Sequence, residues 1–326
     1  MNPTAPPATG PALWQLLQAT AQGVAAVRAG QSATRIMAQV RADLRPGVQA
    51  LLYQSLRYLG RAVALRTQLA RRAPPPAADA LLCTALALAW QADLAPYAPH
   101  TLVNQAVEAA KRQRATQPQA SFLNACLRRF LRERDALVAA TEADPVARWN
   151  HPLWWIQQLQ QDHPAHWQAI LQANQQAAPM TLRVFTRRVT REALQTRWSQ
   201  VGLSAQGVGE QGLVLAAPRG VHDIPGFDEG LCSVQDAAAQ RAAPLLVAGL
   251  KPVTGRVPRL LDACAAPGGK TAHLLELLDA EVVALEVDAE RCQRIQQTLA
   301  RLQLTAEIRC ADAGAPASWW DGRLFD

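Results

Sequence analysis

The sequence has few cysteines for its length, and none of them form a C-x-x-C pair. Six cysteines are scattered over 326 residues, so neither a zinc site nor a disulfide framework is predicted, and we expect no bound metal. Long apolar runs are also missing. The longest, residues 80–90, is much shorter than the roughly 20 residues that cross a bilayer. We therefore expect no membrane-spanning segment.

The first ten residues, MNPTAPPATG, contain neither a basic region nor an apolar core, so they do not match a signal peptide. Residues 1–12 are rich in Pro, Thr and Ala, a composition that predicts disorder. With no disulfide framework and no export signal, the sequence favours a cytoplasmic protein.

Two common phosphate-binding motifs are absent as well. A Walker motif requires a glycine five residues before the Gly-Lys-Thr at residues 269–271, and Cys264 stands at that position. The dinucleotide pattern G-x-G-x-x-G is missing because the turn contains only the adjacent pair Gly268 and Gly269. A ligand held by a pyrophosphate cradle is therefore not indicated.

What is present is a strand, a Gly-rich turn, a helix and a second strand within residues 259–286. Small residues at 265–269 let a ligand approach the backbone, and Glu286 ends the second strand, where a carboxylate can accept ribose hydroxyls. A turn without a phosphate cradle but with an acidic ribose ligand suits S-adenosylmethionine. The alternative is an ordinary βαβ crossover whose glycines only make the turn.

The run Asp262–Thr271, DACAAPGGKT, resembles the cofactor motif of the RNA cytosine-C5 methyltransferases of the RsmB family, also called Sun or Fmu. The resemblance implies S-adenosylmethionine as cofactor. It also implies a binding site made of the motif and two later acids, namely Cys264, Ala265, Ala266, Pro267, Gly268, Gly269, Lys270, Glu286 and Asp312. Two alternatives stay open: Asp288 can bind the ribose in place of Glu286, and Asp312 can belong to an Asx turn.

The N-terminal part, residues 13–140, has helical periodicity throughout, which predicts a bundle of five to seven helices. One continuous helix is expected over residues 49–72. Residues 1–150 hold 17 Lys or Arg and 8 Asp or Glu, a balance of +9, whereas residues 151–326 have a balance of −2. This asymmetry favours a polyanionic partner for the front half. A basic surface that only maintains solubility is the competing explanation.

Residues 121–129, SFLNACLRR, resemble the F-x-N-x-x-L-R-R stretch of NusB-like domains, which are helical and bind RNA. Arg128, Arg129 and Arg132 are the candidate phosphate contacts, and Arg128 and Arg132 share a helix face. A solvated helix face is the alternative.

Residues 141–230 are predicted to form a connector followed by a small α+β module, with strands at residues 181–185 and 212–215 and a helix at residues 191–201 between them. Trp154, Trp155 and Trp167 can stack on bases, but we favour a role as hydrophobic anchors between domains. Around residue 183 the chain resembles the P-x-x-L-R-x-N stretch of the RsmB family, which makes Arg183 a candidate RNA contact. Residues 231–240 resemble the family's V-Q-D segment beside the cofactor pocket.

In the family, catalysis depends on cysteines in a D-A-P-C and a T-C motif: a thiolate adds to C6 of cytosine, which activates C5 for methylation. This sequence contains no Pro-Cys and no Thr-Cys dipeptide. Residues 231–326 also provide only three parallel strands, with an unpaired edge at the first one. We therefore expect the chain to be the N-terminal part of a longer protein, and to be inactive alone.

The predicted fold class is multidomain α and α/β: an all-α NusB-like bundle (13–140), a small α+β module, and the first half of a Rossmann-like S-adenosylmethionine-dependent methyltransferase domain (231–326). The predicted function is methylation of cytosine C5 in small-subunit ribosomal RNA, by a monomer whose partner is that RNA. The alternatives are a non-catalytic NusB-like RNA-binding protein and a methyltransferase with another RNA target.

Overall fold

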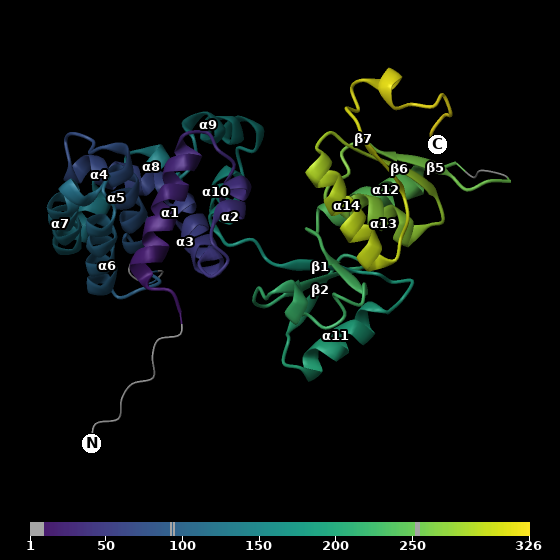
Figure 1. The fold of residues 1–326 in the computed structure, drawn as a ribbon, viewed down its shortest axis with the longest axis horizontal. Coiled ribbons are helices and arrows are strands. Elements are labelled where there is room, and N and C mark those ends of the chain that lie inside the picture. The colour runs from purple at the N-terminus through teal and green to yellow at the C-terminus, as the bar shows by residue number, and fades with distance from the viewer. Residues whose placement is uncertain (1–9, 92, 94, 252–254) are drawn as a thin grey trace. The chain divides into compact units, whose positions relative to one another are not determined.

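A computed structural model describes residues 10–326 except 92, 94 and 252–254. Contacts divide the chain into two compact units, residues 1–177 and residues 178–326, shown in Figure 1. Most of the segment predicted to be disordered, residues 1–9, lies outside the described residues. The predicted boundaries at 140/141 and 230/231 stay predictions.

The first unit consists of helices alone in its described residues. Seven α-helices lie within residues 13–139, as predicted, and three more follow. They are α1 (Leu13–Arg28), α2 (Ala33–Gln39), α3 (Arg45–Arg57), α4 (Leu59–Leu69), α5 (Pro76–Ala89), α6 (Pro99–Arg112), α7 (Ala120–Ala139), α8 (Pro145–Trp149), α9 (Leu153–Asp162) and α10 (Trp167–Gln175), with a 3₁₀ turn η2 (Gln117–Gln119) before α7.

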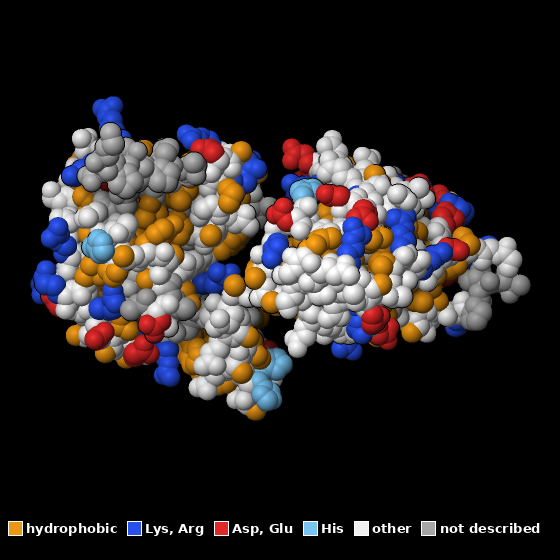
Figure 2. Space-filling model, turned by 90° about the horizontal axis from the view of Figure 1, so that it is seen from below, with side chains coloured by type: hydrophobic (Ala, Val, Ile, Leu, Met, Phe, Trp, Pro, Cys, Tyr) orange, Lys and Arg blue, Asp and Glu red, His pale blue; other side chains and the backbone are white. Residues whose placement is uncertain are grey.

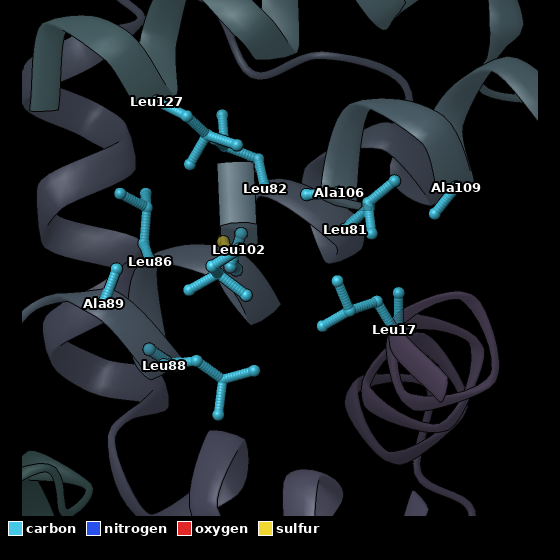
Figure 3. Close-up of a cluster of buried hydrophobic side chains, with 14 of the residues drawn as sticks. Leu17, Leu81, Leu82, Leu86, Leu88, Ala89, Leu102, Ala106, Ala109 and Leu127 are labelled. Atoms are coloured by element: carbon cyan, nitrogen blue, oxygen red, sulfur yellow. The ribbon is translucent and has the colours of Figure 1, made fainter. Parts of the chain in front are cut away.

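Helix α5 is the centre of this unit because nearly every one of its residues is apolar. All residues from Ala78 to Ala89 are buried, and the helix packs against α1, α3, α4, α6 and α7. Figure 3 shows leucines of α5 among Leu17 of α1, Leu102 of α6 and Leu127 of α7. A helix that is hydrophobic on all sides requires such an enclosure.

The single helix predicted over residues 49–72 is wrong, because the chain breaks at Tyr58 between α3 and α4. Side chains from the end of the unit take over the hydrogen bonds at the break. The Arg61 backbone N–H donates to Asn150 Oδ1 at 2.8 Å, and Gln175 Nε2 donates to the Arg57 carbonyl at 3.4 Å. Gly60 allows this approach, since a Cβ there would lie 2.5 Å from the Val146 carbonyl oxygen.

The second unit contains an antiparallel sheet of order β2-β3-β1-β4. Its strands are β1 (Thr181–Val184), β2 (Ala205–Val208), β3 (Gly212–Leu215) and β4 (Cys232–Val234), and helix α11 (Arg191–Gln200) packs on one face. The sequence predicted β1, α11 and β3 but not the short strands β2 and β4. Strand β1 is buried on both faces, because Leu182 and Val184 face the α11 core and Phe185 joins the core of the parallel sheet.

The parallel sheet has the order β5-β6-β7, with strands β5 (Arg259–Asp262), β6 (Glu281–Glu286) and β7 (Glu307–Cys310). Helices α12 (Ala242–Gly249), α13 (Gly269–Leu277) and α14 (Ala289–Leu302) accompany it. The three predicted parallel strands are confirmed. Strand β5 is at one edge, where Asp326 N–H donates to the Arg259 carbonyl at 3.0 Å. None of the helices in the described part of the chain has the length and apolarity needed to span a membrane.

Candidate cofactor site

The Gly-rich turn lies between β5 and α13, and hydrogen bonds between its ends and in its middle fix its backbone. At its start, Asp262 Oδ2 accepts a hydrogen bond from Thr271 Oγ1 at 2.7 Å. In its middle, the Ala265 N–H donates to the Leu285 carbonyl of β6 at 3.0 Å. The backbone of the turn is therefore fixed against both parallel strands that flank it.

Gly268 is required by the geometry of this turn. Its φ is +99°, in the left-handed region that favours glycine, and an added Cβ would lie 3.3 Å from Ile295 Cα and 3.3 Å from Thr298 Cβ. Thr298 Oγ1 also donates to the Pro267 carbonyl at 2.7 Å. Helix α14 thus approaches the turn so closely that a Cβ at 268 would fit only if α14 moved away by a few tenths of an ångström.

Glu286 ends β6, and its carboxylate is almost completely buried, with 3% of the residue exposed. Its Oε1 accepts hydrogen bonds from the Asp288 N–H and from Arg291 Nη1, both at 3.2 Å. Its Oε2 is buried and has no hydrogen-bond partner. A buried carboxylate oxygen without a donor is costly, so this atom is an acceptor available to a ligand hydroxyl.

Asp288, the alternative ribose ligand, caps helix α14. Its Oδ1 accepts from the Glu290 N–H at 2.8 Å and from the Arg291 N–H at 3.1 Å. This N-cap explains an aspartate at position 288 without a ligand.

Asp312 lies just beyond β7, beside the end of β6, since the neighbouring Ala311 N–H donates to the Glu286 carbonyl at 3.0 Å. Its Oδ1 accepts from the Gly314 N–H at 2.8 Å, which is the Asx turn considered as an alternative. The side chain is exposed. Asp262, Glu286 and Asp312 therefore follow one another along the carboxyl edge of the sheet, where ligands bind in such folds.

The remaining motif residues differ in exposure. Ala265 and Gly268 are buried, Ala266 and Gly269 are half-buried, and the others are exposed, namely Cys264, Pro267 and Lys270. Cys292 and Cys310 also lie at this edge, with the Cys292 thiol 3.5 Å from the Glu286 carbonyl oxygen and the Cys310 thiol 3.5 Å from that of Val287. The sequence pattern gave no sign of this proximity. Among the described residues, no group of three or more His, Cys, Asp or Glu is arranged to hold a metal ion.

The structure corrects the prediction for Arg183, which was a candidate RNA contact. The residue is fully buried, and its guanidinium faces α13. Nε and Nη2 donate to the two Glu276 carboxylate oxygens, each at 2.7 Å, and Nη1 donates to the Gly269 carbonyl at 2.8 Å and to Gln235 Oε1. The resemblance to the P-x-x-L-R-x-N stretch gave the residue type at 183 but could not show that its side chain is buried.

His273 lies beside this cluster on α13. It is 1% exposed, its Nε2 is 2.7 Å from Gln211 Oε1, and its Nδ1 has no partner. Burial, and then the nearby positive charge of Arg183, lower the pKa of His273 to about 3. The imidazole is therefore neutral at ordinary pH. Burial also raises the pKa of Glu276, and the Arg183 guanidinium opposes this change.

The candidate RNA contacts on α7 lie at the surface of the helical unit. Arg128 Nε donates to Asn124 Oδ1 at 3.1 Å, while Arg129 and Arg132 pair with Glu133 at 2.9 and 3.7 Å. Figure 2 shows the Lys and Arg side chains of this unit dispersed around the visible face. An RNA role for the three arginines stays a prediction.

The predicted tryptophan anchors differ from one another. The ring centroids of Trp149 and Trp167 lie 5.1 Å apart in an edge-to-face arrangement. Both rings pack against a small buried cluster made of Ile156, Leu159 and Leu171. Trp155 also packs against this cluster, whereas Trp154 is 66% exposed. Trp155 and Trp167 therefore pack inside the helical unit, and a role for the tryptophans as anchors between domains stays a prediction.

Comparison with known proteins links both sheets to one family. A model described as the ferredoxin-like domain of RsmF/B-like methyltransferases matches residues 151–222, and one described as 16S rRNA methyltransferase RsmB/F matches residues 247–326.

Curated relatives match over most of the chain. A ribosomal RNA small subunit methyltransferase B of Vibrio vulnificus is 36% identical over 304 residues, which cover 91% of this chain and 70% of that protein. Its namesake in Pseudomonas putida is 38% identical over 318 residues, 94% of this chain and 71% of that protein. The match to the Vibrio cholerae protein is 40% identical and covers 70% of this chain and 51% of that protein.

A solved structure titled "Crystal Structure of PH0851" has a TM-score of 0.68 to this chain at 18% identity. The match covers 93% of this chain and 71% of the other. At this identity, the comparison shows a shared fold.

Proposed function

Because the chain belongs to the RsmB/F family of small-subunit ribosomal RNA methyltransferases, we propose that it is the cofactor-binding part of an enzyme that methylates cytosine C5 in that RNA. The observation that carries the proposal is the free Oε2 of Glu286, buried at the carboxyl edge of the sheet beside the Gly-rich turn. In Rossmann-like folds, an acid at the end of the strand after the Gly-rich turn commonly accepts hydrogen bonds from the cofactor ribose.

The residues present fit S-adenosylmethionine, which supplies a methyl group activated on a sulfonium. Residues 264–270 would border the cofactor. Glu286 would accept hydrogen bonds from the ribose hydroxyls, and Asp312 is proposed to lie beside the adenine. The Asp288 carboxylate has a structural role as the α14 cap, which supports Glu286 as the ribose ligand.

The nucleophilic cysteine is proposed to lie outside residues 1–326. None of the six cysteines follows a proline or a threonine. Burial raises the pKa of the Cys83 and Cys232 thiols to about 12 and also raises that of Cys126 and Cys292, so these four thiols are protonated and poor nucleophiles. Residues 1–326 alone are therefore expected to transfer no methyl group. Labelled product from the purified chain would contradict this assignment.

Residues 13–140 are proposed to be a NusB-like RNA-binding bundle, residues 141–230 a connector and ferredoxin-like module, and residues 231–326 the start of the methyltransferase domain. The +9 balance of residues 1–150 supports binding of ribosomal RNA, with Arg128, Arg129 and Arg132 as phosphate contacts. We propose a cytoplasmic monomer.

The test compares small-subunit ribosomal RNA from cells with and without the intact gene. Bisulfite sequencing should show one cytosine methylated at C5 only when the gene is present. A Glu286→Gln allele should reduce that signal. An unchanged cytosine pattern after deletion would overturn the proposed function.

A further inference from the structure

Arg183 is the only arginine in the described chain that is 0% exposed, and its position in the fold gives it a task. It lies in the middle of β1, on the face opposite the α11 core, and it contacts α13 at two places. One contact is Glu276, near the carboxyl end of that helix, and the other is the carbonyl of Gly269, its first residue. One guanidinium therefore bridges the first residue of α13 and a side chain that originates two turns further along the same helix.

Stability alone does not account for this arrangement. A buried arginine–carboxylate pair loses hydration on both charges. A well-packed apolar pair of similar size often stabilises the folded protein to the same extent or more. An apolar pair cannot donate to the Gly269 carbonyl, however. The guanidinium has a fixed fork of donors, so a bidentate bond to Glu276 sets its orientation and directs Nη1 at Gly269 and Gln235.

Gly269 directly follows Gly268, the residue whose left-handed backbone completes the cofactor turn. Gln235 also lies next to this point, since a Cβ on Gly269 would be 3.6 Å from Gln235 Nε2. A second link from the antiparallel sheet to α13 runs from Gln211 to His273. The antiparallel sheet thus holds the amino end of α13 through buried polar contacts.

We propose that Arg183 is a positioning residue for the cofactor: by bonding the Gly269 carbonyl it fixes the Gly268–Gly269 turn in the conformation that receives S-adenosylmethionine. The inference rests on the proposed function for its ligand. It assigns Arg183 to the cofactor site through its contacts and gives the ferredoxin-like module a part in cofactor binding.

The test separates the two contacts of Arg183. An Arg183→Met/Glu276→Met double variant removes the ion pair without leaving a lone buried charge, and it also removes the donor to Gly269. Glu276→Gln keeps Arg183 as a donor to Gly269 but breaks the bidentate bond that orients its guanidinium. Arg187→Met is the matched control, because Arg187 pairs with Asp279 just beyond the carboxyl end of α13, at 3.0 Å.

Binding of S-adenosylmethionine to the 326-residue chain is measured by calorimetry, together with amide exchange at residues 268–271. Loss of a charged hydrogen bond that orders the turn should raise Kd about tenfold in the double variant and speed exchange there. Arg187→Met should bind within about twofold of wild type, and Glu276→Gln should fall between wild type and the double variant. Arg183→Lys, which keeps the charge beside Glu276 but lacks the fork, provides a second folded test and should also bind more weakly.

The inference would be overturned if a folded variant kept both the affinity and the amide exchange of wild type. This applies to Arg183→Met/Glu276→Met and to Arg183→Lys. If the wild-type chain itself binds no S-adenosylmethionine, the proposed function fails and the inference fails with it. The two failures are therefore distinguishable.

Discussion

At the scale of single residues, Glu286 and Asp288 are two acids with different tasks. Glu286 has a buried oxygen without a partner, and Asp288 caps a helix. Both acids stand at the end of the same strand, and the sequence alone does not show which of them binds the ribose. The cap at Asp288 depends on the backbone conformation at the start of α14.

Glu286→Gln is expected to weaken S-adenosylmethionine binding about tenfold, since a charged acceptor for the ribose is lost. Asp288→Ala is expected to leave binding unchanged and to lower the free energy of unfolding by about 1 kcal/mol through loss of the cap. Calorimetric titration and urea unfolding of both variants check these outcomes. The reverse pattern would make Asp288 the ribose ligand.

The free energy of unfolding is expected to depend on pH because of His273. Its pKa is about 3 in the folded chain and roughly 6.5 when unfolded, so between these values the unfolded state binds the extra proton. The free energy of unfolding should therefore fall as pH is lowered below about 6.5, with a slope of at most about 1.4 kcal/mol per pH unit from this group. Urea unfolding of wild type and His273→Gln from pH 7 to pH 4.5 measures it. Parallel profiles would contradict the assignment.

At the scale of elements, the cofactor turn depends on one glycine more than on its neighbour. Gly268→Ala is expected to cost about 1–2 kcal/mol of stability for the left-handed conformation, and more for the contact with α14. Gly269→Ala is the matched control, because a Cβ at 269 would lie near only Gln235 Nε2, at 3.6 Å. Thermal unfolding of the two variants checks this, and equal losses would contradict the account.

The packing of helix α5 is stabilised by one buried carboxylate. Asp79, in its first turn, pairs with Arg28 at 2.7 Å and with Arg66 at 2.9 Å. Asp79→Ala should lower the free energy of unfolding by about 3–5 kcal/mol, because it leaves two arginines without their carboxylate. Asp43→Ala, which breaks an exposed pair with Arg41, is the control and should change little. A small loss for Asp79→Ala, measured by urea unfolding, would show that water replaces the pair.

The elements that could be predicted from the sequence are those with long local signals. The apolar run of α5 and the continuous apolar strands around the cofactor turn have such signals. The break at Tyr58 could not be predicted, because it depends on Asn150 and Gln175, about 90 and 120 residues away. Strand β2 is as long as β1 and β3, but its sequence AQGV is half polar or glycine and none of its residues is buried, and β4 has only three residues, so neither has a clear strand pattern.

At the scale of the whole molecule, the cofactor motif predicted the family, because Asp262–Thr271 is a long and specific run. The role of Arg183 was mistaken for a related reason: a motif names residue types, while burial decides whether a charged side chain meets RNA or the protein interior. The charge asymmetry between the two halves is a property of the sequence and needs no structure to be seen.

The measurement that tests the account most directly is equilibrium dialysis of labelled S-adenosylmethionine against the 326-residue chain. We predict saturable binding of one molecule per chain, displaced by S-adenosylhomocysteine and weakened in Glu286→Gln. Absence of saturable binding, or binding that Glu286→Gln leaves unchanged, would contradict the cofactor site described above.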